Sequence, residues 1–256
     1  QARGMRAGLL GAALALFCGC AAHREADKDQ KQSSGTGTVD RLREARKAVE
    51  SDPVNAEAHY RYGNALFDLG IFGEASAAYQ EALRLEPGMA KAYTNLGLTF
   101  RRLGQLEAAA GAYEQALKHN PNDVLTLGNL RAVAELLGDS ERALQCLQRM
   151  VAVTPENRDI VLELAQWLYA LERFDGAAEA YTRITRQRDA TAGDFYALGL
   201  CHYNLDQWDA AESAWTDGLK RDAKHPPLLR AMPVLYWSKG DFDRAWDAVS
   251  RCRRAG

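Results

Sequence analysis

The side chains of this 256-residue sequence that could bind a metal ion or act as nucleophiles include five Cys and five His. The closest grouping is Cys201 and His202, with Asp206 four residues further on. Adjacent residues of a helix point about 100° apart, so the Cys and His of this group cannot chelate one ion together. We therefore expect no metal site, no cofactor and no catalytic residues, and we predict that the protein is not an enzyme. Cys146, Cys201 and Cys252 are expected to be buried thiols, with a disulfide as the alternative.

Two further cysteines, the second of them Cys20, follow an apolar segment near the start of the chain. The cationic Arg6 precedes eleven apolar residues, 7–17, and small residues come after them, which is the layout of a secretory signal peptide. Eleven residues are too few to span a bilayer, which takes about 20. We therefore expect residues 1–19 to be a signal peptide, led by non-native residues at 1–4.

The junction Gly19-Cys20 resembles the lipobox of bacterial lipoproteins, in which the cysteine becomes the first residue of the mature chain and carries the lipid. This resemblance implies that Cys20 is lipidated and that lipid chains anchor the protein. Ala21 follows, where an Asp would mark retention in the inner membrane under the sorting rule of that family. The resemblance thus implies a periplasm-facing protein anchored to the outer membrane.

The segment after the lipobox, residues 20–38, has no apolar periodicity and ends in a cluster of Ser, Gly and Thr. This composition is typical of a disordered tether. Over the 18 residues after Cys20 such a coil has an r.m.s. span of roughly 23 Å. The expected tether would let the folded part stand off the membrane surface.

Charge and composition exclude two other classes of protein. The chain has 32 Lys and Arg against 34 Asp and Glu, a formal net charge of −2, and 47% of its residues are hydrophobic. Nucleic-acid binding that depends on counterion release needs a basic surface, so we expect no nucleic-acid partner. The apolar content is too high for a wholly disordered chain.

An alanine recurs every 34 residues through most of the chain, at Ala75, Ala109, Ala143, Ala177, Ala211 and Ala245. A fixed period of this length is typical of solenoid proteins, whose units bury their apolar faces against their neighbours. We place this alanine at position 20 of each unit. The predicted repeats are then 56–89, 90–123, 124–157, 158–191, 192–225 and a truncated 226–256.

Each repeat carries the pattern of two helices. In the second repeat Leu96, Phe100 and Leu103 are spaced four and three residues apart and form one helical face. Glycine at position 15 in most repeats favours a left-handed residue that ends the first helix. Proline at position 32 in the first three repeats ends the second helix. Residues 39–55 fit a lone second helix that caps the array.

The repeat resembles the tetratricopeptide repeat (TPR), on the letters Tyr93, Leu96-Gly97, Phe100, Ala109, Tyr113 and Pro121. The resemblance covers residues 56–256. It implies an all-α fold, a right-handed TPR superhelical solenoid of paired antiparallel helices. Small residues at positions 8 and 20 are expected to let the paired helices approach closely, while rings at positions 17 and 24 fill the gap.

In TPR proteins, positions 2, 5, 9, 12 and 13 of the first helix line an inner groove, and most of these positions are apolar or aromatic in this chain. Tyr and Trp are typical interface anchors, so the resemblance implies a groove that binds an apolar or amphipathic polypeptide segment. The alternative is that several of the rings pack against the next repeat. The candidate partner-binding residues are Tyr60, Phe67, Leu98, Leu162, Tyr169, Tyr196, Leu200, Tyr203 and Trp237.

In its layout, a lipidated solenoid of six TPR units resembles the Tgl-like group of pilotin lipoproteins of type IV pili. The resemblance implies an outer-membrane protein that binds an unassembled subunit of an outer-membrane secretin. It would assist secretin assembly and localisation in type IV pilus biogenesis, and so act in cell motility. The alternative is a general periplasmic TPR scaffold for cell-envelope enzymes or for another secretion machine.

Overall fold

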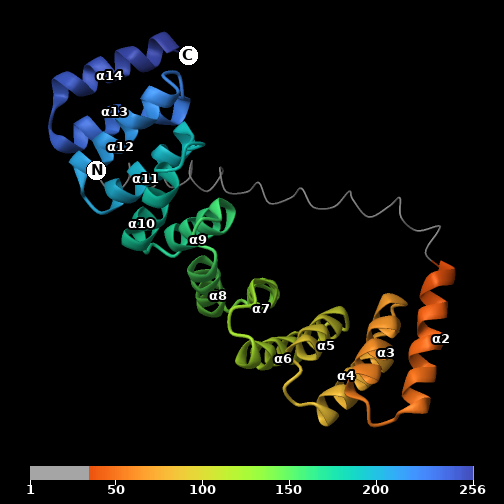
Figure 1. The fold of residues 1–256 in the computed structure, drawn as a ribbon. Helices are drawn as coiled ribbons and strands as arrows, with labels where there is room; N and C mark the ends of the chain where they lie inside the picture. Colours follow the sequence, from red (N-terminus) through yellow and green to blue (C-terminus); the bar gives the residue numbers. More distant parts are fainter. Residues whose placement is uncertain (1–34, 256) are drawn as a thin grey trace. The chain divides into compact units, whose positions relative to one another are not determined.

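The computed structural model describes residues 35–255, which form thirteen helices and no strand (Figure 1). The predicted all-α solenoid of paired TPR helices is confirmed. The expected signal peptide, the lipidation at Cys20 and the tether up to residue 34 lie outside the described residues. Within the described part, no helix is both long enough and apolar enough to cross a membrane.

The described helices fall into two compact units, although the sequence predicts one array. The N-terminal unit, residues 35–153, contains α2 (Gly35–Ser51), α3 (Ala56–Asp68), α4 (Phe72–Leu85), α5 (Ala90–Arg102), α6 (Leu106–His119), α7 (Val124–Leu136) and α8 (Ser140–Val153). The C-terminal unit, residues 154–255, contains α9 (Arg158–Ala170), α10 (Phe174–Thr185), α11 (Ala192–Asn204), α12 (Trp208–Arg221), α13 (Pro226–Lys239) and α14 (Phe242–Ala255). The first helix of each repeat begins at the first residue of the predicted repeat.

The helix that precedes the repeats differs from the expectation at both ends. α2 begins at Gly35, not at residue 39, and ends at Ser51, so residues 35–38 are helical and not part of a tether. Thr38 is only 8% exposed, and Leu42 packs against the core of the first repeat. This burial outweighs the low helix propensity of the Gly-Thr-Gly-Thr stretch, because tertiary packing supplies most of the stability of helices in proteins.

The residue at position 15 has a left-handed backbone in all six repeats, whether or not it is glycine. Gly104 has a φ of 74°, and Gly70, Gly138 and Gly240 are similar. Glu172 and Asp206 occupy the same position in the fourth and fifth repeats, with φ values of 57° and 59°. A left-handed conformation costs a non-glycine residue about 1–2 kcal/mol. The turn between the paired helices therefore requires a left-handed residue at this position, and Glu172 and Asp206 adopt it at this energetic cost.

The paired helices approach most closely where position 8 of the first helix faces position 24 of the second. A Cβ atom added to Gly97 would lie 2.6 Å from Cε1 of the Tyr113 ring. A Cβ atom added to Gly199 would lie 2.0 Å from Nε1 of Trp215, which donates a hydrogen bond to the Tyr196 carbonyl at 3.0 Å. The two rings are fully buried. The absent side chain at position 8 thus provides the space for the ring at position 24.

Two repeats depart from this pairing at both positions together. The third and sixth repeats have Arg131 and Pro233 at position 8, where the sequence pattern calls for a small residue. Position 24 holds the aliphatic Leu147 and Val249 in these same repeats. A smaller side chain on the second helix therefore accompanies a larger one on the first.

Replacing Gly199 with Ala should destabilise the C-terminal unit by about 1–3 kcal/mol, the usual cost of overpacking. The indole cannot move away without losing its hydrogen bond to the Tyr196 carbonyl. All five Trp residues lie in this unit, so urea unfolding followed by Trp fluorescence reports its stability. Gly193→Ala is the control, because a Cβ atom there meets only the Thr191 hydroxyl, at 3.5 Å. Equal midpoints for the two variants would contradict the close approach.

Candidate functional site

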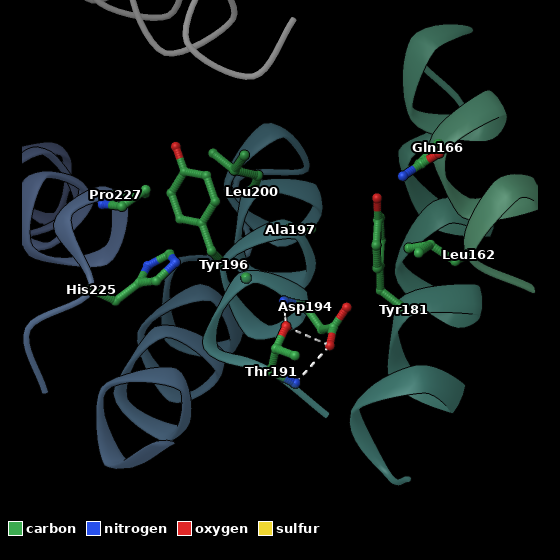
Figure 2. Close-up of a pocket in the computed structure, with 11 residues that line it drawn as sticks. Leu162, Gln166, Tyr181, Thr191, Asp194, Tyr196, Ala197, Leu200, His225 and Pro227 are labelled. Atoms are coloured by element: carbon green, nitrogen blue, oxygen red, sulfur yellow. Dashed lines mark hydrogen bonds between the residues drawn. The ribbon is translucent and has the colours of Figure 1, made fainter. Parts of the chain in front are cut away.

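A mostly apolar cavity of about 220 Å³ lies in the C-terminal unit (Figure 2). We call it the C-terminal cavity. α9, α10 and α11 supply most of its walls, and the start of α13 closes one side. Its lining residues are Leu162, Gln166, Tyr181, Thr191, Gly193, Asp194, Tyr196, Ala197, Leu200, His225 and Pro227.

Three of the predicted partner-binding residues meet at this cavity. Leu162 comes from position 5 of the fourth repeat, and Tyr196 and Leu200 come from positions 5 and 9 of the fifth. Tyr196 is only 4% exposed, because its ring stacks on Trp215 with centroids 6.3 Å apart. The sequence therefore located three residues of one cavity. One of them, Tyr196, also packs against Trp215 in the core.

Two other candidates, Tyr169 and Tyr203, lie in the packing and do not line the cavity. The Tyr203 ring stacks on Trp215 at 5.9 Å, and its hydroxyl hydrogen-bonds with Ser238 at 2.9 Å. The Tyr169 ring packs edge-on against Phe174 at 5.3 Å. Both tyrosines are less than 10% exposed. The ring contacts lie within each tyrosine's own repeat, whereas the hydroxyls reach the next repeat, with the Asn204 amide donating to Tyr169 at 3.3 Å and Ser238 bonded to Tyr203. These neighbours cover faces that a partner would contact.

The candidates of the N-terminal unit lie around a second, more polar cavity of about 390 Å³, the N-terminal cavity. Phe67 and Leu98 line it. The Asn95 side-chain amide donates to the Asn64 side-chain oxygen at 2.8 Å and to the Tyr60 hydroxyl at 3.2 Å. These hydrogen bonds connect the first helices of two successive repeats and leave fewer groups for a partner.

The remaining candidate, Trp237, is 58% exposed on α13. Its ring packs edge-on against Phe242 of α14, with centroids 4.9 Å apart. It lines neither of the two cavities described above. Trp237 is therefore accessible but separate from the other candidates.

A buried carboxylate forms one polar edge of the C-terminal cavity. Oδ2 of Asp194 accepts hydrogen bonds from the backbone N–H of Thr191 at 2.7 Å and from its hydroxyl at 2.8 Å. The same oxygen accepts from Nη2 of Arg158 at 2.7 Å. Sequence reasoning missed this group, although the spacing Thr-x-x-Asp before an apolar helix is the signal of a capping box. The pairing with Arg158, 36 residues away, left no local signal.

Two other polar groups of the cavity have no hydrogen-bond partner among the described residues. They are the hydroxyl of Tyr181 and Nδ1 of His225, both shielded from solvent. At the equivalent place in the first repeat, the Tyr79 hydroxyl donates to Asn64 at 2.8 Å. Burial raises the pKa of Tyr181, so its hydroxyl is neutral and can donate as well as accept. A buried polar group without a partner costs about 1–3 kcal/mol, which a suitable ligand could recover.

Cys201 and the neighbouring His202 do not form a reactive group. Cys146, Cys201 and Cys252 are free thiols. Burial raises the pKa of Cys201 to about 12, which keeps its thiol protonated and unreactive at neutral pH. The neighbouring His202 hydrogen-bonds through Nδ1 with Gln207 at 2.7 Å. Across the described residues, no three His, Cys, Asp or Glu side chains gather where they could hold a metal ion.

The architecture defines a helical-repeat protein, and comparison with family models identifies the repeat. Models of the tetratricopeptide repeat match residues 63–104, 90–123 and 134–194. The chain is therefore a TPR protein. No curated protein matches the sequence significantly.

Solved structures with the same fold support this assignment. One is YrrB, described as a TPR protein with an unusual peptide-binding site, which is 22% identical with a TM-score of 0.54. The match covers 73% of this chain and 96% of YrrB. Another is Naa15/Naa10 bound to HypK-THB, 16% identical with a TM-score of 0.66, where the match covers 95% of this chain but 36% of the other. Identities this low establish the fold alone.

Replacing Asp194 with Ala should lower the stability of the C-terminal unit by about 1–3 kcal/mol, because the carboxylate half of the capping box is lost and Arg158 loses its closest partner. Asp189→Ala is the control: its exposed carboxylate lies 3.6 Å from the same Arg, and the expected change is below about 0.5 kcal/mol. Urea unfolding followed by Trp fluorescence measures both variants. A larger loss from Asp189→Ala would show that the cavity edge does not depend on Asp194.

Proposed function

We propose that this TPR protein is a non-catalytic scaffold that binds a polypeptide segment of a protein partner through the C-terminal cavity. The observation that carries the proposal is an apolar cavity on first-helix residues of two successive repeats, with an unpartnered hydroxyl in its wall. Leu162 and Gln166 occupy positions 5 and 9 of one repeat, and Tyr196 and Leu200 occupy the same positions of the next.

The size and chemistry of the cavity favour a protein partner over a small molecule. Its volume of about 220 Å³ is below the roughly 300–1,000 Å³ of typical small-molecule sites. Interfaces of proteins place single aromatic or aliphatic anchors in pockets of this kind. A solved protein of the same fold is described as having a peptide-binding site, which supports the same use of the repeat here.

More specifically, we propose an outer-membrane lipoprotein, anchored through Cys20, that assists the assembly of a secretin for type IV pilus biogenesis. The support is the signal-like sequence before Cys20 and the layout of the repeats behind it. In this proposal the cavity holds an exposed segment of an unassembled secretin subunit, and the lipid keeps the event at the membrane. A general scaffold for cell-envelope enzymes or another secretion machine is the competing function.

The binding proposal predicts that Leu162→Asp reduces partner capture at least tenfold, equivalent to 1.4 kcal/mol. A carboxylate in the apolar wall would have to lose its hydration when a partner binds. The measurement is affinity capture from a solubilised cell envelope, quantified by mass spectrometry. Val54→Asp, at a position 74% exposed in the N-terminal unit, is the control and should capture as wild type does.

The captured proteins distinguish the finer alternatives. Enrichment of a secretin supports the pilotin function, and enrichment of cell-wall enzymes supports the general scaffold. Equal capture by the wild-type protein and Leu162→Asp would contradict binding at this cavity.

The lipoprotein proposal predicts that Cys20→Ser moves the protein from the outer-membrane fraction to the soluble periplasmic fraction, because the lipid attachment is lost. Fractionation followed by immunoblotting measures the change. Cys18→Ser is the matched control, two residues earlier, and should leave the protein in the membrane fraction. Unchanged fractionation of Cys20→Ser would reject the lipid anchor.

A further inference from the structure

The C-terminal cavity is lined by aromatic rings and aliphatic side chains. In Figure 2, Tyr196 and Tyr181 stand on either side of Ala197, with Leu162 and Leu200 completing the apolar lining. Ala197 adds only a methyl group between the two rings, so a side chain of the partner meets rings on either side of this methyl. Aromatic pairs gain from offset or edge-to-face packing beyond the area that they bury.

The polar groups of the cavity select among planar side chains. The Tyr181 ring is 1% exposed, and its hydroxyl has no hydrogen-bond partner among the described residues. Gln166 lies on the same side of the cavity, and Nδ1 of His225 is a second buried, unpartnered atom on the opposite side (Figure 2). An apolar ring would leave the Tyr181 hydroxyl unsatisfied, whereas a ring with a hydroxyl can donate to it or accept from it.

The charge of the cavity excludes ionic ligands. Its one acidic lining residue, Asp194, already pairs with Arg158 at 2.7 Å and accepts two hydrogen bonds from Thr191. Among the described residues, no Lys or Arg lines the cavity. A charged side chain would therefore lose its hydration without gaining a partner of opposite charge.

We propose that the C-terminal cavity is a specificity pocket for one tyrosine side chain of the partner, whose phenol hydroxyl pairs with the Tyr181 hydroxyl. This inference rests on the proposed binding of a polypeptide segment and adds which residue of that segment the protein recognises. Tyr196 and Leu200 hold the ring, and Tyr181 distinguishes tyrosine from phenylalanine.

The test compares N-acetyl-tyrosinamide with the phenylalanine, tryptophan and leucine amides, each titrated into the full chain by NMR. The tyrosine amide should bind about three- to tenfold more tightly than the phenylalanine amide, the effect of one hydrogen bond to a buried group. The tryptophan and leucine amides should bind more weakly than tyrosine. Equal affinities for tyrosine and phenylalanine, or tighter binding of tryptophan, would overturn the proposal.

Three variants test which residues produce the selectivity. Tyr181→Phe removes only the hydroxyl and should make the tyrosine and phenylalanine amides bind equally. Tyr113→Phe is the matched control, because Tyr113 has the same repeat position and an equally buried, unpartnered hydroxyl in the N-terminal unit. It should keep the preference for tyrosine. Ala197→Leu fills the cavity and should weaken binding of all the amides at least tenfold, with an unchanged fluorescence unfolding curve.

The amide titrations and the partner capture can fail separately. If Leu162→Asp loses the partner but the amides show no preference for tyrosine, the protein binds a segment and the tyrosine pocket is wrong. If the amides show the predicted selectivity but no partner depends on Leu162, the pocket stands and the proposed scaffold function is wrong. Selectivity that survives in Tyr181→Phe would overturn the role of its hydroxyl.

Discussion

The close contact between position 8 of one helix and the ring at position 24 of its partner is the constraint on which the rest of the fold depends. Gly97 and Gly199 have no room for a methyl group beside Tyr113 and Trp215. In the four repeats that have a ring at position 24, this ring fixes how near and at what height the paired helices lie, because cores packed to crystal-like density do not tolerate extra atoms. Once each pair is fixed, neighbouring pairs can stack and bury the alanine at position 20, which is fully buried or nearly so in every repeat.

The same contact builds the C-terminal cavity. Trp215, the position-24 ring of the fifth repeat, donates to the Tyr196 carbonyl and stacks on the Tyr196 ring, which holds one wall of the cavity in place. Tyr181, the position-24 ring of the fourth repeat, forms another wall, and its buried hydroxyl has no hydrogen-bond partner among the described residues. The rings that hold the helices together therefore also shape the site. This coupling explains why Tyr196 is both a packing residue and a lining residue.

Much of the fold could be predicted from the sequence, because equivalent positions of the 34-residue repeat carry similar residue types. The first helices begin at the predicted residues, and the left-handed backbone at position 15 persists at Glu172 and Asp206, where the glycine is missing. The candidate site could be predicted less well from the sequence. Periodicity places Tyr203 and Tyr196 on similar faces of their helix. Only the structure shows that the Tyr203 ring stacks on Trp215 and that its hydroxyl hydrogen-bonds with Ser238. The ion pair of Asp194 with Arg158 joins residues of different repeats, and no recurring repeat position indicates it.

The most direct test of the account is a crystal structure of the protein with a bound segment of its captured partner. A tyrosine ring of the segment should lie between Tyr181 and Tyr196, with its hydroxyl within hydrogen-bonding distance of the Tyr181 hydroxyl. A segment bound at the N-terminal cavity or on an outer helix face, with no side chain between these two rings, would contradict it.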